Sequence, residues 1–342
     1  MTPWLVCLAA AAAAPQDVVL RGGHLVGVGV TDVAIRNGTI AEIGPGVAPE
    51  LLALPIPGRW IVPAFVDSHV HLAYRNTPEA LGDGGIAAAV DLAAPLGWIG
   101  RDQPPLRVLW SGPMITTTGG YPLDGWGRDG YGWPADDPLA AGAAVDLLVA
   151  AGAGVIKMPI TGGSSPDPVS QEAIVAAAHA LGKKVVAHAL TDADARAAAR
   201  AGADALAHTP VAPLSDATVQ AWAGRAVIST LGAFGGTPDA VDNLRRLRAA
   251  GATVLYGTDY GNTTTPGIDP RELALLAQAG LDGDAILAAA TTAPAAYWGW
   301  SDLGRLAPGQ AASFLVVSRD PRTDPTILAD PVQVWIGGVR RK

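Results

Sequence analysis

Five apolar segments of this 342-residue sequence each end near residues that could hold a metal ion. The candidates, in chain order, are His69, His71, Lys157, His188, His208 and Asp259. Side chains two apart in a strand point to the same side, so the first two histidines could reach one ion together. The chain has six histidines, and only His24 and His179 fall outside this pattern, so we expect those two to be structural or exposed. The joint pattern predicts a metal site.

Lys157 needs separate treatment, because an ammonium group cannot bind a cation. It stands in the apolar sequence Gly-Val-Ile-Lys-Met, residues 154–158, and burial in such a strand disfavours the charged form of lysine. The neutral amine could add carbon dioxide and become a carbamate, whose two oxygens could bridge two metal ions. The alternative is an unmodified lysine beside a single metal ion held by the other candidates.

The segments that must position these residues alternate between helix and strand over residues 63–303. Four times, an alanine-rich helix end is followed by glycine and a short apolar strand, at residues 150–157, 180–188, 201–208 and 249–259. Glycine favours the helix-ending conformation, and the repeat predicts a parallel sheet with right-handed crossovers. The region's length, about 240 residues, is close to the roughly 250 typical of an α/β fold of the (β/α)8 TIM-like barrel type. The ends of barrel strands share one face, so the candidate ligands would meet at one mouth.

Both ends of the chain are rich in strand signals. Strands are predicted at residues 17–20, 32–36, 39–43, 60–66, 313–317 and 332–340. Asn37-Gly38 and Gly337-Gly338 are two-residue hairpin signals. Chain termini often lie close together, so we expect a small composite β-sandwich from residues 16–62 plus 304–342, beside the barrel over 63–303.

Composition excludes several classes of protein. Hydrophobic residues make up 49% and charged residues 16%, which excludes a disordered chain. A net charge of −8 without a basic run argues against a nucleic-acid partner and favours a small-molecule substrate. The one cysteine, Cys7, excludes a cysteine-based zinc site and an internal disulfide framework. The sequence leaves open whether the chain forms a homo-oligomer.

Residues 4–14 form a short apolar run that is too short to span a bilayer. Residues 1–15 are therefore either a signal peptide, although no basic residue precedes the run, or a disordered start. The first alternative places the protein in the periplasm or outside the cell, and the second in the cytoplasm. No other stretch is apolar and long enough to predict a membrane span.

These motifs together resemble the amidohydrolase superfamily, in particular the branch of metal-dependent hydrolases related to imidazolonepropionase and to Xaa-Pro or Xaa-Arg dipeptidases. The matching motifs are residues 35–38, 63–71, 118–120, 156–158, 161–163, 186–188, 202–208, 257–259 and 304–317. The resemblance covers nearly the whole mature chain. It implies a binuclear site in which His69, His71 and Asp259 hold one metal and His188 and His208 the other. It also implies that carboxylated Lys157 bridges the two metals.

Two positions depart from the pattern of that branch. Tyr121 stands where a histidine usually follows the glycine pair, so a substrate-contacting imidazole is lost. Ser313 stands where an aspartate is usual, and we expect little effect on the chemistry because that strand belongs to the sandwich.

The predicted activity is hydrolysis of an amide-like C–N bond, in a cyclic amide, an N-acyl amino acid or a dipeptide. Two divalent ions, with zinc favoured by the ligand types, would generate a bridging hydroxide. Asp259 would transfer its proton to the leaving nitrogen. A lactonase or other ester hydrolase on the same site is the alternative, followed by a non-catalytic metal-binding relative. Deamination ranks lower, since Ala-Leu-Thr rather than a glutamate follows His188.

Candidate substrate contacts come from the loop over residues 121–133. Its aromatic residues include Tyr121, Trp126 and Trp133, which suit an apolar or aromatic substrate group. The alternative is that these rings only pack the loop. Arg75 could pair with a substrate carboxylate, or it could be a surface arginine.

Overall fold

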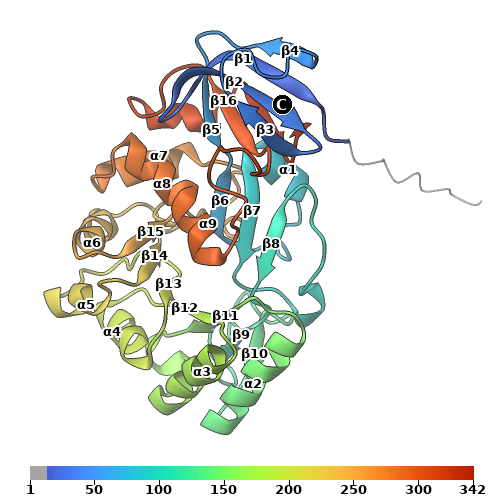
Figure 1. The fold of residues 1–342 in the computed structure, drawn as a ribbon. Coiled ribbons are helices and arrows are strands. Elements are labelled where there is room, and N and C mark those ends of the chain that lie inside the picture. Colours follow the sequence, from blue (N-terminus) through green and yellow to red (C-terminus); the bar gives the residue numbers. More distant parts are fainter. Residues whose placement is uncertain (1–13) are drawn as a thin grey trace, which may run out of the picture.

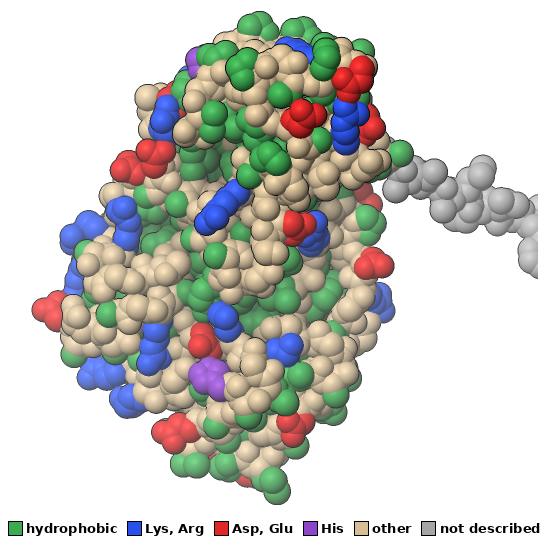
Figure 2. Space-filling model, in the orientation of Figure 1, with side chains coloured by type: hydrophobic (Ala, Val, Ile, Leu, Met, Phe, Trp, Pro, Cys, Tyr) green, Lys and Arg blue, Asp and Glu red, His purple; other side chains and the backbone are tan. Residues whose placement is uncertain are grey.

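The protein has an α/β fold, seen in a computed structural model that describes residues 14–342 (Figure 1). The sheet built from the chain ends lies at one end of the molecule, and the helices of the middle region lie beyond it. Most of the predicted signal peptide, including Cys7, falls outside the described residues. Acidic and basic side chains are interspersed on the face seen in Figure 2. No helix within residues 14–342 is long and apolar enough to cross a membrane.

The two ends of the chain share one eight-stranded sheet. Its strands are β1 (Val18–Leu25), β2 (Gly29–Arg36), β3 (Thr39–Ile43), β4 (Leu52–Pro55), β5 (Trp60–Pro63), β16 (Phe314–Val317), β17 (Gln333–Ile336) and β18 (Val339–Arg340). The order is β18-β17-β16-β5-β1-β2-β3, with β4 paired to β1. Both predicted hairpins are confirmed: Asn37 and Gly38 have φ of 48° and 77°, and Gly337 and Gly338 have 57° and 77°. Positive φ at both central residues is what such a turn requires.

The middle of the chain supplies two parallel sheets. One contains β6 (Phe65–Val70), β7 (Ile86–Asp91) and β8 (Arg107–Trp110), and the other contains β11 (Val155–Pro159), β12 (Lys184–His188), β13 (Ala205–Leu206), β14 (Ala226–Ile228) and β15 (Thr253–Leu255). Main-chain bonds join them on both sides, from Gly154 N to Trp110 O at 2.9 Å and from Ser68 N to Tyr256 O at 2.9 Å. This arrangement is consistent with a TIM-barrel-like domain.

Helices and short strands complete this region. The helices are α1 (Pro78–Asp83), α2 (Pro138–Ala150), α3 (Pro168–Ala180), α4 (Asp192–Ala201), α5 (Asp216–Ala221), α6 (Pro238–Ala249), α7 (Pro270–Gln278), α8 (Gly283–Ala290) and α9 (Thr292–Trp298). The pair β9 (Met114–Thr116) and β10 (Gly132–Pro134) encloses the loop over residues 121–131. Asp167, Thr237 and Asp269 cap α3, α6 and α7, each accepting a main-chain bond from the first turn and each followed by proline.

The predicted strand over residues 60–66 is wrong, because the structure divides it into β5 and β6. Pro63 has no N–H to continue the ladder, and the chain changes sheets at Ala64. The Ala64 amide still donates to Ser313 O at 3.0 Å, whereas the Phe65 amide donates to Gly85 O at 2.9 Å. This change of sheets places His69 within β6 and not beyond a strand that ends at residue 66.

The limits of strands near the candidate ligands also differ from the prediction. β11 continues to Pro159, so Lys157 lies in the middle of a strand. β15 ends at Leu255, and the chain after it bonds to the β6 side instead, with Asp259 N donating to His69 O at 2.8 Å. Asp259 itself has a φ of 56°, which is outside the extended region. The candidate ligands therefore differ in where they lie relative to the ends of their strands: Lys157 lies inside β11, whereas Asp259 lies beyond the end of β15.

Candidate metal centre

Three of the predicted ligands converge on one point. His69 lies in β6, His71 follows that strand directly, and Asp259 follows β15. The Nε2 atoms of the two histidines are 3.3 Å apart, and Asp259 Oδ1 lies 3.6 Å from His69 Nε2 and 3.1 Å from His71 Nε2. All three side chains are buried, and one ligand atom from each lies within 4.8 Å of the others. This geometry suits coordination of a single cation.

Main-chain and hydroxyl groups orient the imidazoles. His69 Nδ1 donates to the Ala207 carbonyl at 2.9 Å, which leaves the lone pair on Nε2. His208 Nδ1 is 2.9 Å from Thr230 Oγ1, and His71 Nδ1 lies 3.4 Å from Ala93 O. Such bonds from the far ring nitrogen are the usual way in which a protein fixes metal-binding histidines.

His188 and His208 lie beside this group. The ring centroids of His208 are 4.5 Å from His69 and 4.9 Å from His188. Burial lowers the pKa of His188 to about 3 and holds the pKa of His69 and His208 well below the ordinary value. The positive charge of Lys157 adds to the lowering of the pKa in all three. Neutral imidazoles are the form that binds metal.

Lys157 is fully buried, and burial lowers its pKa to about 7. Within residues 14–342, neither its Nζ nor His188 Nδ1 has a hydrogen-bond partner. A buried polar atom without a partner is costly, so these two atoms point to a bound group that satisfies them. The donor set of imidazole nitrogens, one carboxylate and a lysine of lowered pKa fits divalent cations such as zinc.

A cavity of about 320 Å³ opens onto these ligands. Of the four predicted substrate contacts, Tyr121 and Trp126 line it. The Tyr121 ring stacks on His188 with centroids 4.8 Å apart, and Trp126 Nε1 donates to its hydroxyl at 3.1 Å. Trp133 lies in β10 and packs against the main core, and Arg75 lies 6.0 Å from the Tyr260 ring centroid. Neither of these two lines the cavity.

Sequence reasoning missed two buried carboxylates that hold the ligand segments, Asp67 and Asp91. Burial raises the pKa of each to about 7. Asp67 accepts bonds from the His69 amide at 3.1 Å and from Thr258 Oγ1 at 2.5 Å, so it ties β6 to the segment that carries Asp259. Asp91 accepts from the Leu72 amide at 2.6 Å, behind His71. Asp91 is the last residue of the apolar strand β7. A position at the end of an apolar strand is the same sequence signal that identified the candidate ligands.

Phe234 and Asn262 were also missed, and both line the cavity. Phe234 meets His208 edge to face, with centroids 4.7 Å apart. Asn262 Nδ2 donates to Asp259 Oδ1 at 3.1 Å. Phe234 ends a short 3-10 helix, Gly232–Phe234, and Asn262 lies in the turn after β15. Neither belongs to a distinctive local motif, and only the fold brings them to the metal centre.

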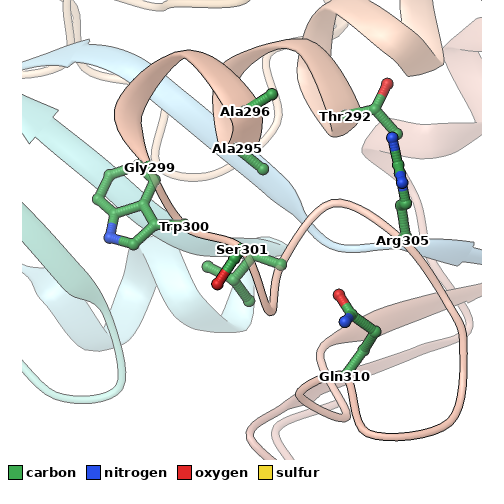
Figure 3. A pocket seen from close by; sticks show the side chains of 9 residues that line it. Thr292, Ala295, Ala296, Gly299, Trp300, Ser301, Arg305 and Gln310 are labelled. Carbon is green, nitrogen blue, oxygen red and sulfur yellow. The ribbon is translucent and has the colours of Figure 1, made fainter.

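A second cavity, of about 340 Å³, lies between α9 and residues 299–310 (Figure 3). Thr292, Trp300, Ser301, Arg305 and Gln310 contribute its polar groups. Its lining contains no imidazole and no carboxylate, so it lacks the groups needed for metal binding or for acid–base chemistry. The chemistry is therefore assigned to the cavity at His69 and Asp259.

Comparisons with known proteins show which families and folds this chain resembles. The model of the Amidohydrolase family matches residues 237–341. An adenine deaminase of Paracoccus denitrificans is 34% identical over 105 residues, but the match covers only 26% of this chain and 17% of that protein. A solved Xaa-Pro dipeptidase with bound methionine superposes with a TM-score of 0.80, at 19% identity, over 95% of this chain and 99% of the other. The A. niger ochratoxinase gives a TM-score of 0.75, at 20% identity, over 96% of each chain.

Proposed function

Since residues 237–341 match the Amidohydrolase family model and 95% of the chain shares the fold of a solved amidohydrolase, we propose that this protein is a metal-dependent hydrolase of an amide-like C–N bond. The observation that carries the proposal is the convergence of His69, His71 and Asp259 at the floor of one cavity. His188, His208 and Lys157 supply a second group of ligands beside them. We propose that the two parallel sheets and their helices correspond to the expected (β/α)8 barrel over residues 63–303, and that the eight-stranded sheet of the chain ends corresponds to the expected composite β-sandwich.

The proposed ligand assignment is the one implied by the resemblance to the amidohydrolase superfamily. The convergence of His69, His71 and Asp259 and the unpartnered Lys157 Nζ and His188 Nδ1 support it. His69, His71 and Asp259 would hold one divalent cation, and His188 and His208 a second, with a carboxylated Lys157 between them. Carboxylation requires the neutral amine, which burial favours by lowering the pKa of Lys157 to about 7. Cations bound here would lower the pKa of water and polarise the substrate carbonyl.

Asp259 is the side chain placed to move protons. It lines the cavity, and Asn262 donates to its Oδ1 and so limits its rotation. Its carboxylate would accept a proton as water attacks the carbonyl carbon and would deliver that proton to the nitrogen as the C–N bond breaks. The amide is thereby converted to a carboxylic acid and an amine, with one water consumed.

Deamination is the second candidate function, because part of the chain matches adenine deaminase. Among residues 14–342, the only carboxylate in the cavity lining is that of Asp259, which already belongs to the ligand group. Residues 189–191, after His188, are Ala-Leu-Thr and offer no second acid. These features favour amide hydrolysis over attack on a purine ring.

The proposal is tested with zinc-loaded protein on a panel of acylated amino acids, dipeptides, cyclic amides, lactones and adenine. Amide cleavage that disappears with a chelator and returns with zinc would support it. Ammonia release from adenine without amide cleavage would favour the deaminase. Full amide hydrolysis in metal-free protein would contradict the proposed chemistry.

A further inference from the structure

The wall of the active-site cavity beyond the metal ligands is uncharged. It is formed by Met114, Tyr121, Trp126, Leu190, Phe234 and Asn262, with Ala233 beside them. Asn262 is already bonded to Asp259, so the wall offers a substrate mainly apolar and aromatic surface. The single charged side chain in the lining is the carboxylate of Asp259.

The arginines that flank this region in sequence are directed elsewhere. Arg75 lies over the Tyr260 ring, Arg128 Nη2 donates to the Asp124 carbonyl at 3.4 Å, and Arg271 Nη2 donates to the Gly235 carbonyl at 2.8 Å. None of them lines the cavity. A carboxylate bound against this wall, away from the proposed metal ions, would therefore lose its water without gaining a cationic side chain as a partner.

Resting on the proposed hydrolase function, we infer that the substrate is a neutral amide with an aromatic or bulky apolar group beside the scissile bond. A dipeptide or acylated amino acid with a free carboxylate next to that bond does not suit the cavity. Burial of an unpaired carboxylate is strongly unfavourable, whereas aromatic groups are bound well by aromatic walls. The structure thus narrows the substrate classes expected from the sequence.

Two loops supply the aromatic surface from separate parts of the chain. Tyr121 and Trp126 come from the loop between β9 and β10, and Trp126 meets His71 at 5.3 Å between centroids. Phe234 comes from the segment after β14 and packs against His208. Each ring lies directly against a metal-binding imidazole. A substrate held by these rings would therefore have its apolar group next to the reacting carbonyl.

A matched pair of substrates tests the inference. N-benzoylglycine and its N-methylamide offer the same benzoyl–nitrogen bond, but only the first carries a carboxylate. We expect kcat/KM at least about 10²-fold higher for the methylamide, because the acid must be bound without a counter-charge. Equal values, or a preference for the acid, would overturn the inference and leave the hydrolase proposal intact.

Binding provides a readout that does not depend on turnover. Calorimetry with zinc-loaded Asp259→Asn protein should give a similar preference in Kd for the methylamide over the acid. Tighter binding of the acid, or no binding of either compound, would overturn the inference. If the methylamide binds preferentially but wild-type protein cleaves no amide, the inference stands and the hydrolase proposal fails.

Two variants test whether the uncharged wall of the cavity causes the preference for the methylamide over N-benzoylglycine. Phe234→Arg places a cation on the wall and should shift the ratio of kcat/KM at least about tenfold toward N-benzoylglycine. Arg75→Ala removes an arginine that lies outside the cavity and should leave the ratio unchanged. Loss of activity toward the acid alone in Arg75→Ala would show that Arg75 reaches the substrate and would contradict the inference.

Discussion

The Nε2 atoms of His69 and His71 face each other at 3.3 Å, although the two residues are separated by only one position in the chain. The far nitrogen of His69 donates to a carbonyl, so its Nε2 carries a lone pair. If His71 has the same tautomer, the two lone pairs oppose each other and a cation between them relieves the repulsion. The distance of both atoms to Asp259 Oδ1 is consistent with a shared ion.

His71→Ala should therefore reduce bound metal. Loss of one of three ligands in the group weakens binding of its ion, and we expect the metal content to fall from about two ions per chain to about one. Elemental analysis of purified protein measures this. His179→Ala is the matched control, because His179 is bonded to Asp204 on the surface and lies outside the site. Unchanged metal content in His71→Ala would remove this residue from the ligand set.

Lys157→Ala should abolish activity and lower metal content, because it removes the group that would bridge the two ions. Short carboxylic acids such as acetate or propionate should restore part of the activity by occupying the space left by the side chain. The control is Lys183→Ala, which removes a lysine that lies before β12 and is not part of the ligand group. Wild-type activity and metal content in Lys157→Ala would show that the lysine is only part of the core.

Trp126→Ala and Trp133→Ala should have different effects. Trp126 lines the cavity, so its removal should change the ratio of kcat/KM for aromatic and small aliphatic amides by about tenfold or more, with constant metal content. Trp133 packs against the core, so its removal should lower the free energy of unfolding by about 2 kcal/mol and leave that ratio unchanged. Substrate assays and denaturant titrations measure the two effects. A changed ratio in Trp133→Ala would show that Trp133 also reaches the substrate.

Local signals were sufficient for much of the fold. The hairpin at Asn37-Gly38 and the helix starts at Pro168, Pro238 and Pro270 depend on turn and cap chemistry within a few residues. The limits of β5 and β6 could not be predicted in this way. The apolar run over residues 60–66 is continuous, and its division at Ala64 depends on pairing with Ser313 and Gly85, which lie far away in the chain.

The distinction between local sequence signals and contacts between distant parts of the chain also applies to the site. His69, His71 and Asp259 could be predicted to meet, because parallel strands bring their ends to one face. Asn262 and Phe234 could not, because their positions depend on loops that the fold brings back over that face. Trp133 was predicted as a substrate contact because it belongs to an aromatic loop sequence. In the structure it lies in β10 and packs against the core.

Glu272→Gln should alter how stability depends on pH. Burial raises the pKa of Glu272 from 4.5 to about 7, although the amides of Leu231 and Gly232 donate to it. Between these two values the folded protein holds a proton that the unfolded chain has released, so the free energy of unfolding falls as the pH rises through this window. The variant lacks this contribution, and its slope should be shallower by up to about 1.4 kcal/mol per pH unit.

Denaturant titrations at several pH values between 4.5 and 7 would measure the two slopes under identical metal conditions. The buried carboxylate Asp91 contributes equally to both proteins. The charge of Glu272 raises the pKa of Asp67, so the difference in slope reports Glu272 together with its coupling to Asp67. Glu172→Gln, at an exposed position on α3, should keep the wild-type slope. Parallel slopes for Glu272→Gln and wild type would show that Glu272 is ionised throughout this range in the folded protein.

Asp259→Asn separates proton transfer from metal binding at one residue. Asp259 has a φ of 56°, a conformation that asparagine adopts about as readily as aspartate, so the variant should keep the local backbone. Its amide oxygen can still face the cation, but it cannot accept a proton as a carboxylate does. General acid–base groups contribute about 10²–10⁴-fold to rate, so kcat should fall by that order while KM changes little.

Asn262→Ala provides a second test of the role of Asp259 in proton transfer. Its Nδ2 donates to Asp259 Oδ1 at 3.1 Å, so Asn262→Ala frees the carboxylate to rotate without removing the base. We expect a smaller fall in kcat, about tenfold, with metal content unchanged, because the base is kept but the hydrogen bond that orients it is lost. Elemental analysis and steady-state kinetics would show whether Asp259 acts chiefly as a base or as a metal ligand. Metal loss in proportion to activity in Asp259→Asn would make Asp259 chiefly a ligand. Near-normal kcat in the metal-loaded variant would instead require that another group in the cavity take the proton.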